Sequence, residues 1–214
     1  MSDEVSSGIG SHAPGHYGAI GASSDSKSRL TLQQLTINCA WNVQGDAGRA
    51  DVVDAAQRLF GLELPARANA VAAGDAWTAV WMGPRSWLLL RHSLPQDDVR
   101  SLNDARDALN AAGAALFDVS ASRVAYRIAG ALAADVLARS CPLDFHRRAF
   151  PSGSVQQSVL GHVNALLLRS QDGDGEGNAF TVMVARSFAL DVWQALCTAS
   201  AGVGYEVMPP RAFS

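Results

Sequence analysis

Four side chains in the middle of the chain could do chemistry: Asp118, Ser120, Cys141 and His146. Nucleophilic catalysis needs a serine or cysteine beside a base, and a third group that orients this base. The spacing of these residues does not form a nucleophile elbow or supply an orienting carboxylate. Asp118 suits a turn in which it accepts backbone N–H bonds, or an ion pair with Arg123. The sequence therefore predicts no catalytic residue here.

Metal and cofactor sites are not expected on this chain either. Cys141 and His146 could supply two zinc ligands, but a zinc site needs four and no second pair accompanies them. Asp172, Asp174 and Glu176 resemble the start of a calcium loop, yet the closing bidentate glutamate is absent. Neither a G-x-G-x-x-G dinucleotide motif nor a P-loop is present. We expect no cofactor and no metal on this chain.

The segment CPLDFHRRAFPSG, residues 141–153, alternates charged and aromatic side chains. Arginine and aromatic residues dominate the energetically important positions of protein interfaces, so this segment is a candidate partner contact. A well-packed connection between a helix and a hairpin is the alternative interpretation. Together with an arginine from the preceding segment, the candidate partner contacts are Arg123, Asp144, Phe145, His146, Arg147, Arg148 and Phe150.

Composition limits the kinds of partner that this chain can have. The 214 residues carry a net charge of −3 with interspersed signs, so the basic stripe that nucleic-acid binding needs is missing. No apolar run is long enough for a membrane span, and the N-terminus does not have the pattern of a signal peptide. The three cysteines are an odd number with long gaps, unlike a disulfide framework. We expect a cytoplasmic protein that binds neither nucleic acid nor membrane.

Hydrophobic periodicity predicts an α+β fold with mainly antiparallel sheets and packed helices. Residues 1–28 are rich in serine and glycine and are expected to be a disordered tail. One domain is expected over 29–208, followed by a short C-terminal tail over 209–214. Expected strands cover 35–42, 115–119, 124–128 and 180–185; expected hairpins cover 77–91 and 154–169; expected helices cover 46–60, 96–112, 131–139 and 188–199.

Four ordered blocks resemble the gamma subunit of heterotetrameric sarcosine oxidase. They are WMGPRSWLLL (81–90), DVSASR (118–123), IAGALAADVLARSCPLDFHRRAFPSGSVQQSVLG (128–161) and VARSFALDVWQAL (184–196). The sequence departs from the family pattern at Arg85 and Ser86, where acidic residues are usual, at Ser140 in place of glycine, and at Phe145 in place of leucine.

This resemblance implies a fold like the folate-binding domain of the glycine-cleavage aminomethyltransferases, which share the Asp-Val-Ser turn at residues 118–120. Those enzymes carry paired aspartates in a hairpin, one of which assists transfer to folate. The matching hairpin here, LGHVNALLLRS (160–170), contains no acid. Because Ala165 or Leu166 cannot handle a proton, folate chemistry is not expected on this chain.

The resemblance further implies a non-catalytic structural subunit of a complex with alpha, beta and delta subunits. Such a complex oxidises sarcosine with oxygen to glycine and hydrogen peroxide, and passes the one-carbon unit to tetrahydrofolate or releases formaldehyde. FAD, FMN and NAD are expected on the alpha and beta chains, tetrahydrofolate on the alpha chain and zinc on the delta chain. A stand-alone folate-binding protein or aminomethyltransferase-like enzyme, and a scaffold with a different partner, are the alternatives.

Overall fold

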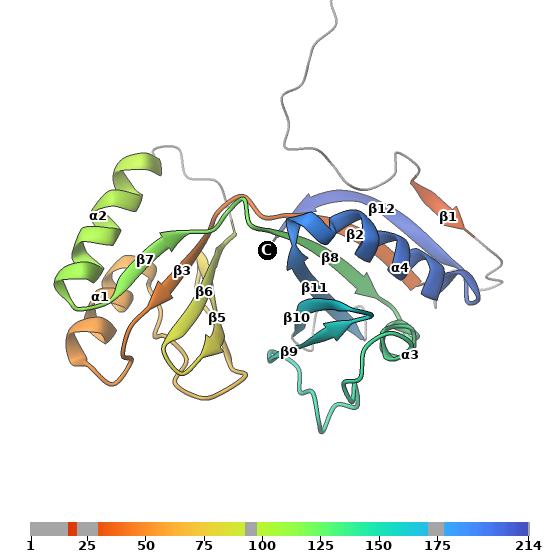
Figure 1. Ribbon diagram of the computed structural model, residues 1–214, viewed down its shortest axis with the longest axis horizontal. Helices are drawn as coiled ribbons and strands as arrows, with labels where there is room; N and C mark the ends of the chain where they lie inside the picture. The colour runs from red at the N-terminus through yellow and green to blue at the C-terminus, as the bar shows by residue number, and fades with distance from the viewer. Residues whose placement is uncertain (1–16, 21–29, 93–97, 171–177, 214) are drawn as a thin grey trace, which may run out of the picture.

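The structure is a computed structural model that describes residues 17–20, 30–92, 98–170 and 178–213. Its strands form two sheets that lie side by side (Figure 1), and each sheet carries its own pair of helices. This arrangement confirms the predicted α+β class with mainly antiparallel sheets, because only one of the strand pairings found in the described ranges is parallel.

The seven-stranded sheet is built from both ends of the chain. Its only parallel pair in the described ranges joins β12 (Tyr205–Ala212) to β2 (Leu30–Thr36). The 3-10 turn Arg186–Phe188 leads into α4 (Ala189–Ala201), which packs on this sheet with α3 (Ala133–Ala138). In spatial order its strands are β1 (Gly18–Ile20), β12 (Tyr205–Ala212), β2 (Leu30–Thr36), β8 (Arg123–Ala129), β11 (Ala179–Ala185), β10 (Val163–Arg169) and β9 (Val155–Leu160), and the helices are α3 (Ala133–Ala138) and α4 (Ala189–Ala201).

The five-stranded sheet uses a continuous part of the sequence and is antiparallel throughout. Helix α1 (Ala50–Phe60) is capped at its C-terminus by Gly61, which has a left-handed conformation (φ 67°). The N–H of Gly61 donates a hydrogen bond to the carbonyl of Gln57. In spatial order the strands are β4 (Val71–Ala73), β5 (Trp77–Gly83), β6 (Ser86–Arg91), β3 (Ala40–Gln44) and β7 (Ala115–Asp118), and the helices are α1 (Ala50–Phe60) and α2 (Asp98–Ala111).

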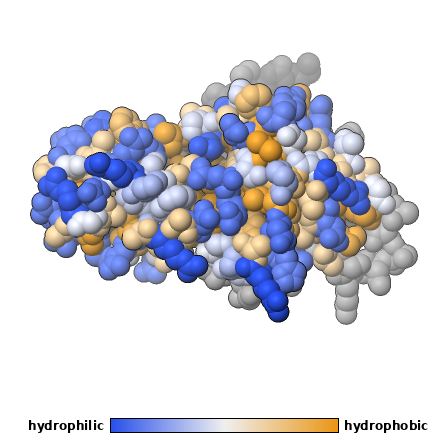
Figure 2. Space-filling view, turned by 60° about the horizontal axis from the view of Figure 1, so that its bottom comes forward, coloured by the Kyte–Doolittle hydropathy of each residue, from blue (hydrophilic) through white to orange (hydrophobic). Residues whose placement is uncertain are grey.

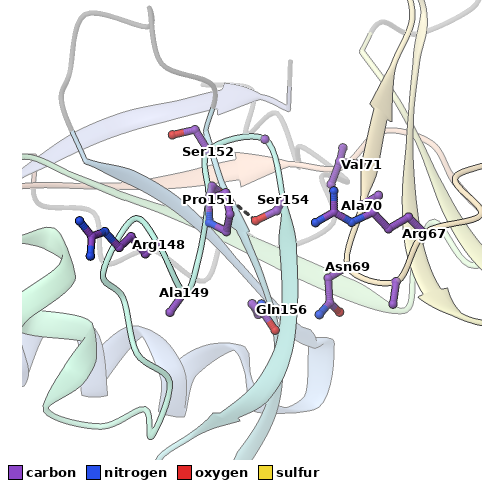
Figure 3. Close-up of a pocket in the computed structure, with 12 residues that line it drawn as sticks. Arg67, Asn69, Ala70, Val71, Arg148, Ala149, Pro151, Ser152, Ser154 and Gln156 are labelled. Atoms are coloured by element: carbon purple, nitrogen blue, oxygen red, sulfur yellow. Dashed lines mark hydrogen bonds between the residues drawn. The ribbon is translucent and has the colours of Figure 1, made fainter.

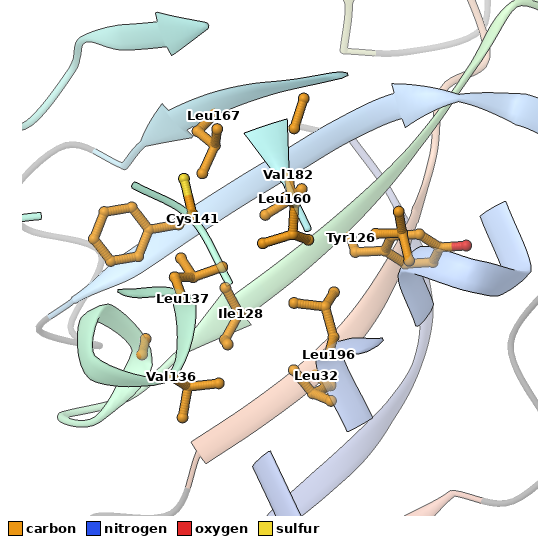
Figure 4. Packing of buried hydrophobic residues seen from close by; sticks show 14 of the residues in the cluster. Leu32, Tyr126, Ile128, Val136, Leu137, Cys141, Leu160, Leu167, Val182 and Leu196 are labelled. Atoms are coloured by element: carbon orange, nitrogen blue, oxygen red, sulfur yellow. The ribbon is translucent and has the colours of Figure 1, made fainter. Parts of the chain in front are cut away.

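Each sheet has a core against its own helices, and a third core joins the two sheets. In the first core, the Tyr126 ring lies 5.3 Å from that of Trp193, and its hydroxyl donates to the carbonyl of Ala189 in α4. Figure 4 shows the aliphatic side chains of this core meeting between the sheet and the helices. The third core includes Val80, Leu166 and Met183, so the sheets face each other through apolar side chains.

The chain changes sheets twice, and the sequence pattern indicated neither crossing. The single strand predicted over 35–42 is two strands, because β2 ends at Thr36 in one sheet and β3 begins at Ala40 in the other. The chain returns through the turn between β7 and β8. The alternation of apolar residues continues across the connection at residues 37–39, so periodicity alone predicts a single strand over 35–42.

The predicted ends of the domain also differ from the structure. Residues 209–212, predicted as a tail, belong to β12, and Phe213 is buried with its N–H donating to the carbonyl of Thr36. Three residues of the predicted N-terminal tail form β1, which pairs with β12; most of the remaining tail lies outside the described residues. A register shift between Met208 and Arg211 accommodates the prolines at 209 and 210 within the pairing of β12 with β2.

Two hairpin glycines allow a matched test of backbone strain. Gly161, in the turn between β9 and β10, has φ 63°, whereas Gly83 does not have a left-handed φ, and a Cβ at either position would meet open space. We expect Gly161→Ala to lower the free energy of unfolding by roughly 1–2 kcal/mol through strain. Gly83→Ala should leave it unchanged or raise it by about 0.5 kcal/mol, because alanine restricts the unfolded chain. Urea denaturation of both variants measures the difference; equal effects would contradict the strain argument.

Candidate partner-binding surface

The Asp-Val-Ser turn at residues 118–120 is held by its own side chains. The Asp118 Oδ1 accepts the backbone N–H of Ser120 at 2.9 Å and the Ser120 hydroxyl at 2.6 Å. The Ser120 Oγ in turn accepts the N–H of Ala40 at 2.9 Å, which ties the turn to β3. Within the described residues Asp118 makes no ion pair with Arg123. Of the two roles that the sequence left open, Asp118 takes the turn-capping one.

The segment of residues 141–153, called here the 141–153 loop, is fixed from inside by Arg169. This side chain is only 4% exposed, and its guanidinium donates to the carbonyls of Phe145 and Phe150, both at 2.9 Å. It also donates to Asn178 Oδ1 at 2.6 Å and lies 5.1 Å from the centre of the Phe180 ring. A buried cation with several acceptors holds a loop firmly, because each carbonyl would otherwise be unsatisfied.

Two of the predicted partner contacts face the interior. Phe145 and Phe150 are 6% and 0% exposed, and their rings lie 5.3 and 5.8 Å from that of Phe180. Both belong to the core of the seven-stranded sheet, so they cannot contact a partner while the loop is folded. The prediction is corrected for these two residues. Alternating charged and aromatic residues also describe a loop whose rings anchor it, and the sequence did not distinguish the two cases.

The charged residues of the same loop point outward. Asp144, His146, Arg147 and Arg148 are all exposed. The Asp144 Oδ1 accepts the N–H of His146 at 2.8 Å, and the His146 Nδ1 accepts that of Arg148 at 3.3 Å, which keeps this part of the loop tightly turned. The loop therefore presents a compact, mainly basic surface on a rigid base.

Two surface pockets flank the 141–153 loop. One, of about 520 Å³, is lined by Asp144, His146, Arg147 and the buried Arg169. The other, of about 390 Å³, lies between the loop and the 67–71 segment. Figure 3 shows Arg67 and Arg148 on opposite sides of this second pocket, with Ser154 and Gln156 between them.

The 67–71 segment brings the two sheets together at this second pocket. The N–H of Val155 donates to the carbonyl of Asn69 at 3.0 Å, and Ala70 forms an isolated bridge with Ser154. Asn69 itself has φ 63°, a conformation that asparagine tolerates better than most residues. The sequence pattern predicted no helix or strand between residues 61 and 76, and so missed both β4 (Val71–Ala73) and the position of Arg67.

Arg123 lines a third pocket, of about 470 Å³, at the start of β8. It is half-buried, and burial lowers the pKa of its guanidinium. The pocket also contains part of the acid-free hairpin, where Ala165 and Leu166 are buried and Asn164 is exposed. Asn164, Ala165 and Leu166 do not have a side chain that could accept or release a proton as an aspartate does.

Cys141 and His146 do not form a site together, because Cys141 is buried in the core while His146 is exposed. In the described ranges no group of three or more His, Cys, Asp and Glu side chains could hold a metal ion. The acidic Asp172, Asp174 and Glu176 lie outside those ranges. No helix in the part of the chain that the structure describes has the length and apolar character needed to cross a membrane.

Among the described residues, large apolar side chains are exposed in a few places. On the face seen in Figure 2, hydrophobic residues lie in small groups among hydrophilic ones. Phe117 at the end of β7 is 50% exposed, and Phe188 and Leu190 at the start of α4 are 39% and 53% exposed. Exposed apolar side chains scattered in this way are common on protein surfaces and do not by themselves mark an interface.

Curated proteins that resemble this chain in sequence include sarcosine oxidase gamma subunits. The chain is 33% identical over 129 residues to the sarcosine oxidase subunit gamma of Corynebacterium sp. (strain U-96), a match that covers 60% of this chain and 59% of the relative. It is 31% identical over 129 residues to the same subunit from an Arthrobacter species, with 60% of each chain covered. The match thus spans about three fifths of the length of these curated relatives.

Solved structures share the fold. A chain of the heterotetrameric sarcosine oxidase from Corynebacterium sp. U-96, in complex with pyrrole 2-carboxylate, superposes with a TM-score of 0.71 at 23% identity, covering 83% of this chain and 87% of that one. The glycine cleavage system aminomethyltransferase T from Bartonella henselae gives a TM-score of 0.57 at 13% identity, covering 86% of this chain and 48% of that one. Both likenesses confirm the predicted aminomethyltransferase-like fold.

A family model matches the larger part of the sequence. It describes the sarcosine oxidase gamma subunit family and spans residues 44–202, from the end of β3 to just beyond α4. This range contains the 141–153 loop, the Asp-Val-Ser turn and the acid-free hairpin. The chain belongs to the sarcosine oxidase, gamma subunit family.

Proposed function

We propose that this chain is a structural subunit, without a catalytic centre of its own, of a heterotetrameric sarcosine oxidase. The family match over residues 44–202 carries this proposal. It is supported by the hairpin whose counterpart in the aminomethyltransferases holds paired aspartates. In this chain the corresponding strand β10 offers Asn164, Ala165 and Leu166, and the last two are buried.

The complex would oxidise sarcosine with oxygen to glycine and hydrogen peroxide, and the one-carbon unit would pass to tetrahydrofolate or leave as formaldehyde. Its FAD, FMN, NAD, zinc and tetrahydrofolate would be bound by the alpha, beta and delta subunits. The contribution of this chain would be to hold these subunits together in the cytoplasm. Its partner contacts would be the half-buried Arg123 and the exposed Asp144, His146, Arg147 and Arg148, while Phe145 and Phe150 support the loop from within.

Affinity purification of the tagged chain from its native host tests this function. We expect recovery of flavin-containing partners and sarcosine-dependent formation of hydrogen peroxide. The chain expressed alone should be colourless and should turn yellow only when co-expressed with its partners. Recovery of the chain without any flavoprotein would overturn the proposal.

Calorimetry of the isolated chain distinguishes the proposal from a stand-alone folate-binding protein. A folate enzyme or carrier should bind tetrahydrofolate without any partner. Because the hairpin lacks the carboxylate needed for proton handling, we expect no heat of binding up to millimolar concentration. Micromolar binding by the isolated chain would favour the folate function instead.

Arg147→Glu tests the exposed side of the 141–153 loop. Reversing a charge at an interface places like charges together, so we expect the affinity for partners to fall by about 30-fold or more. The Tm of the isolated chain should change little, because Arg147 is exposed. Arg58→Glu, at an exposed position in the last turn of α1, is the matched control and should assemble normally. Unchanged co-elution of Arg147→Glu would mean that this loop only packs within its own chain.

A further inference from the structure

The pocket beside Arg123, called here the Arg123 pocket, forms where the two sheets meet. Met82 of β5 lines it from the five-stranded sheet, and Gln157 and Asn164 line it from the β9–β10 hairpin. The Gln157 side chain donates to the carbonyl of Met82 at 2.9 Å, which joins the two walls. Arg123 supplies the charge of this pocket, because every other lining residue in the described part of the chain is neutral.

The Arg123 guanidinium has no counter-ion among the residues that the structure describes. No hydrogen bond or ion pair joins its side chain to the described residues, and Asp118, the nearest acid along the sequence, is bonded to Ser120. The neighbouring Arg186 adds positive charge, since its guanidinium donates to the carbonyls of Ala121 and Arg123 at 2.7 and 3.5 Å. Partial removal of an arginine from water without an acceptor costs free energy, which a bound anion would offset.

The composition of the pocket favours a carboxylate over a phosphate. A single guanidinium matches one negative charge, and its planar fork suits the two oxygens of a carboxylate. Amide and hydroxyl groups of Asn164 and Ser158 line the same pocket and can donate further hydrogen bonds. A phosphate dianion would call for more cations or for a set of backbone N–H groups.

We propose that the Arg123 pocket binds a carboxylate, supplied by an aspartate or glutamate side chain of a partner subunit. This inference rests on the proposed function. It specifies that the interface contact at Arg123 is an ion pair with a carboxylate. The pocket lies where both sheets contribute, so a carboxylate there fixes the partner against both halves of the chain at once.

The first arm of the test measures assembly and stability separately. For Arg123→Met we expect the affinity for partners in the co-expressed complex to fall by about 30-fold. The Tm of the isolated chain should stay the same or rise by roughly 2–4 °C, because an uncompensated cation is removed. Arg123→Lys retains the charge but not the planar guanidinium that can bond both oxygens of a carboxylate. We expect its affinity for partners to fall about fivefold. The control Arg58→Met should change neither quantity. Parallel loss of stability and affinity in Arg123→Met would assign a purely structural role and overturn the proposal.

The second arm uses acetate as a free carboxylate, with chloride at equal ionic strength as the control. Acetate should raise the Tm of the isolated wild-type chain by about 2–4 °C at ten times its Kd, but not that of Arg123→Met. Arg123→Lys should respond weakly, which keeps this arm informative if the methionine variant does not fold. An absent acetate effect in the wild-type chain, together with normal assembly of Arg123→Met, would overturn the carboxylate site.

The two arms separate the source of the carboxylate from the proposed function. If Arg123→Met assembles normally but acetate stabilises only the wild-type chain, the pocket binds a free carboxylate. The proposal that a partner side chain supplies the carboxylate is then refuted. If the wild-type chain recovers no flavoprotein, the proposed function fails, while the acetate titration still decides whether the pocket recognises a carboxylate.

Discussion

Arg169→Met is expected to lower the free energy of unfolding by about 4 kcal/mol and the Tm by roughly 10 °C. The side chain is almost fully buried and satisfies the carbonyls of Phe145 and Phe150 as well as Asn178 Oδ1. Methionine fills much of the volume but donates no hydrogen bond, so these acceptors would be left in an apolar environment. Thermal unfolding followed by circular dichroism measures the change.

Arg148→Met is the matched control, since it removes the same charge from an exposed position on the loop that Arg169 supports. Its Tm should stay within about 1–2 °C of the wild-type value. Limited proteolysis adds a local measurement, because a loosened 141–153 loop in Arg169→Met should be cut faster than in the control. Equal Tm values for the two variants would show that the buried guanidinium does not hold the loop.

Trp77→Ala, in the core of the five-stranded sheet, should lower the free energy of unfolding by about 4 kcal/mol. Its ring lies 4.7 Å from that of Trp41 and 5.4 Å from that of Phe60, and the Arg91 guanidinium lies 5.4 Å from its centre. Removing the indole leaves a cavity between β3, β5 and α1. Urea denaturation measures the loss of stability.

Phe117→Ala provides the control for this substitution. Phe117 lies in β7 of the same sheet but is 50% exposed, so its loss should cost less than about 1 kcal/mol. A single transition in Trp77→Ala, seen by both tryptophan fluorescence and circular dichroism, would show that the two sheets unfold together. A cost no larger than that of Phe117→Ala would contradict the packing argument.

Most helices and hairpins were predictable because their signals are local. Gly83 and Pro84 indicated the turn between β5 and β6, and Gly61 indicated the end of α1. The crossings between sheets were not predictable, because pairing partners are chosen by contacts between distant residues. The alternating residues near Cys39 fit one long strand as well as they fit two short ones in different sheets.

The orientation of the side chains on the candidate surface could not be predicted. Residue types marked the 141–153 loop as dense in charge and aromatic rings, but they did not indicate that Phe145 and Phe150 face inward. That outcome depends on Arg169 and Phe180, which are distant in sequence and close in space. Arg123 was a predicted partner contact, but the pocket that it lines could not be predicted, because its walls come from β5 and the β9–β10 hairpin, which are distant in sequence.

The position of β12 between β1 and β2 has a consequence for synthesis of the chain on the ribosome. The five-stranded sheet uses residues 40–118, so all its strands are available before β8 to β12 have been made. In the seven-stranded sheet, β2 must wait for its parallel neighbour until residues 205–212 emerge. During this interval one edge of β2 is unpaired and open to association with other chains, so β12 closes a vulnerable edge when it pairs.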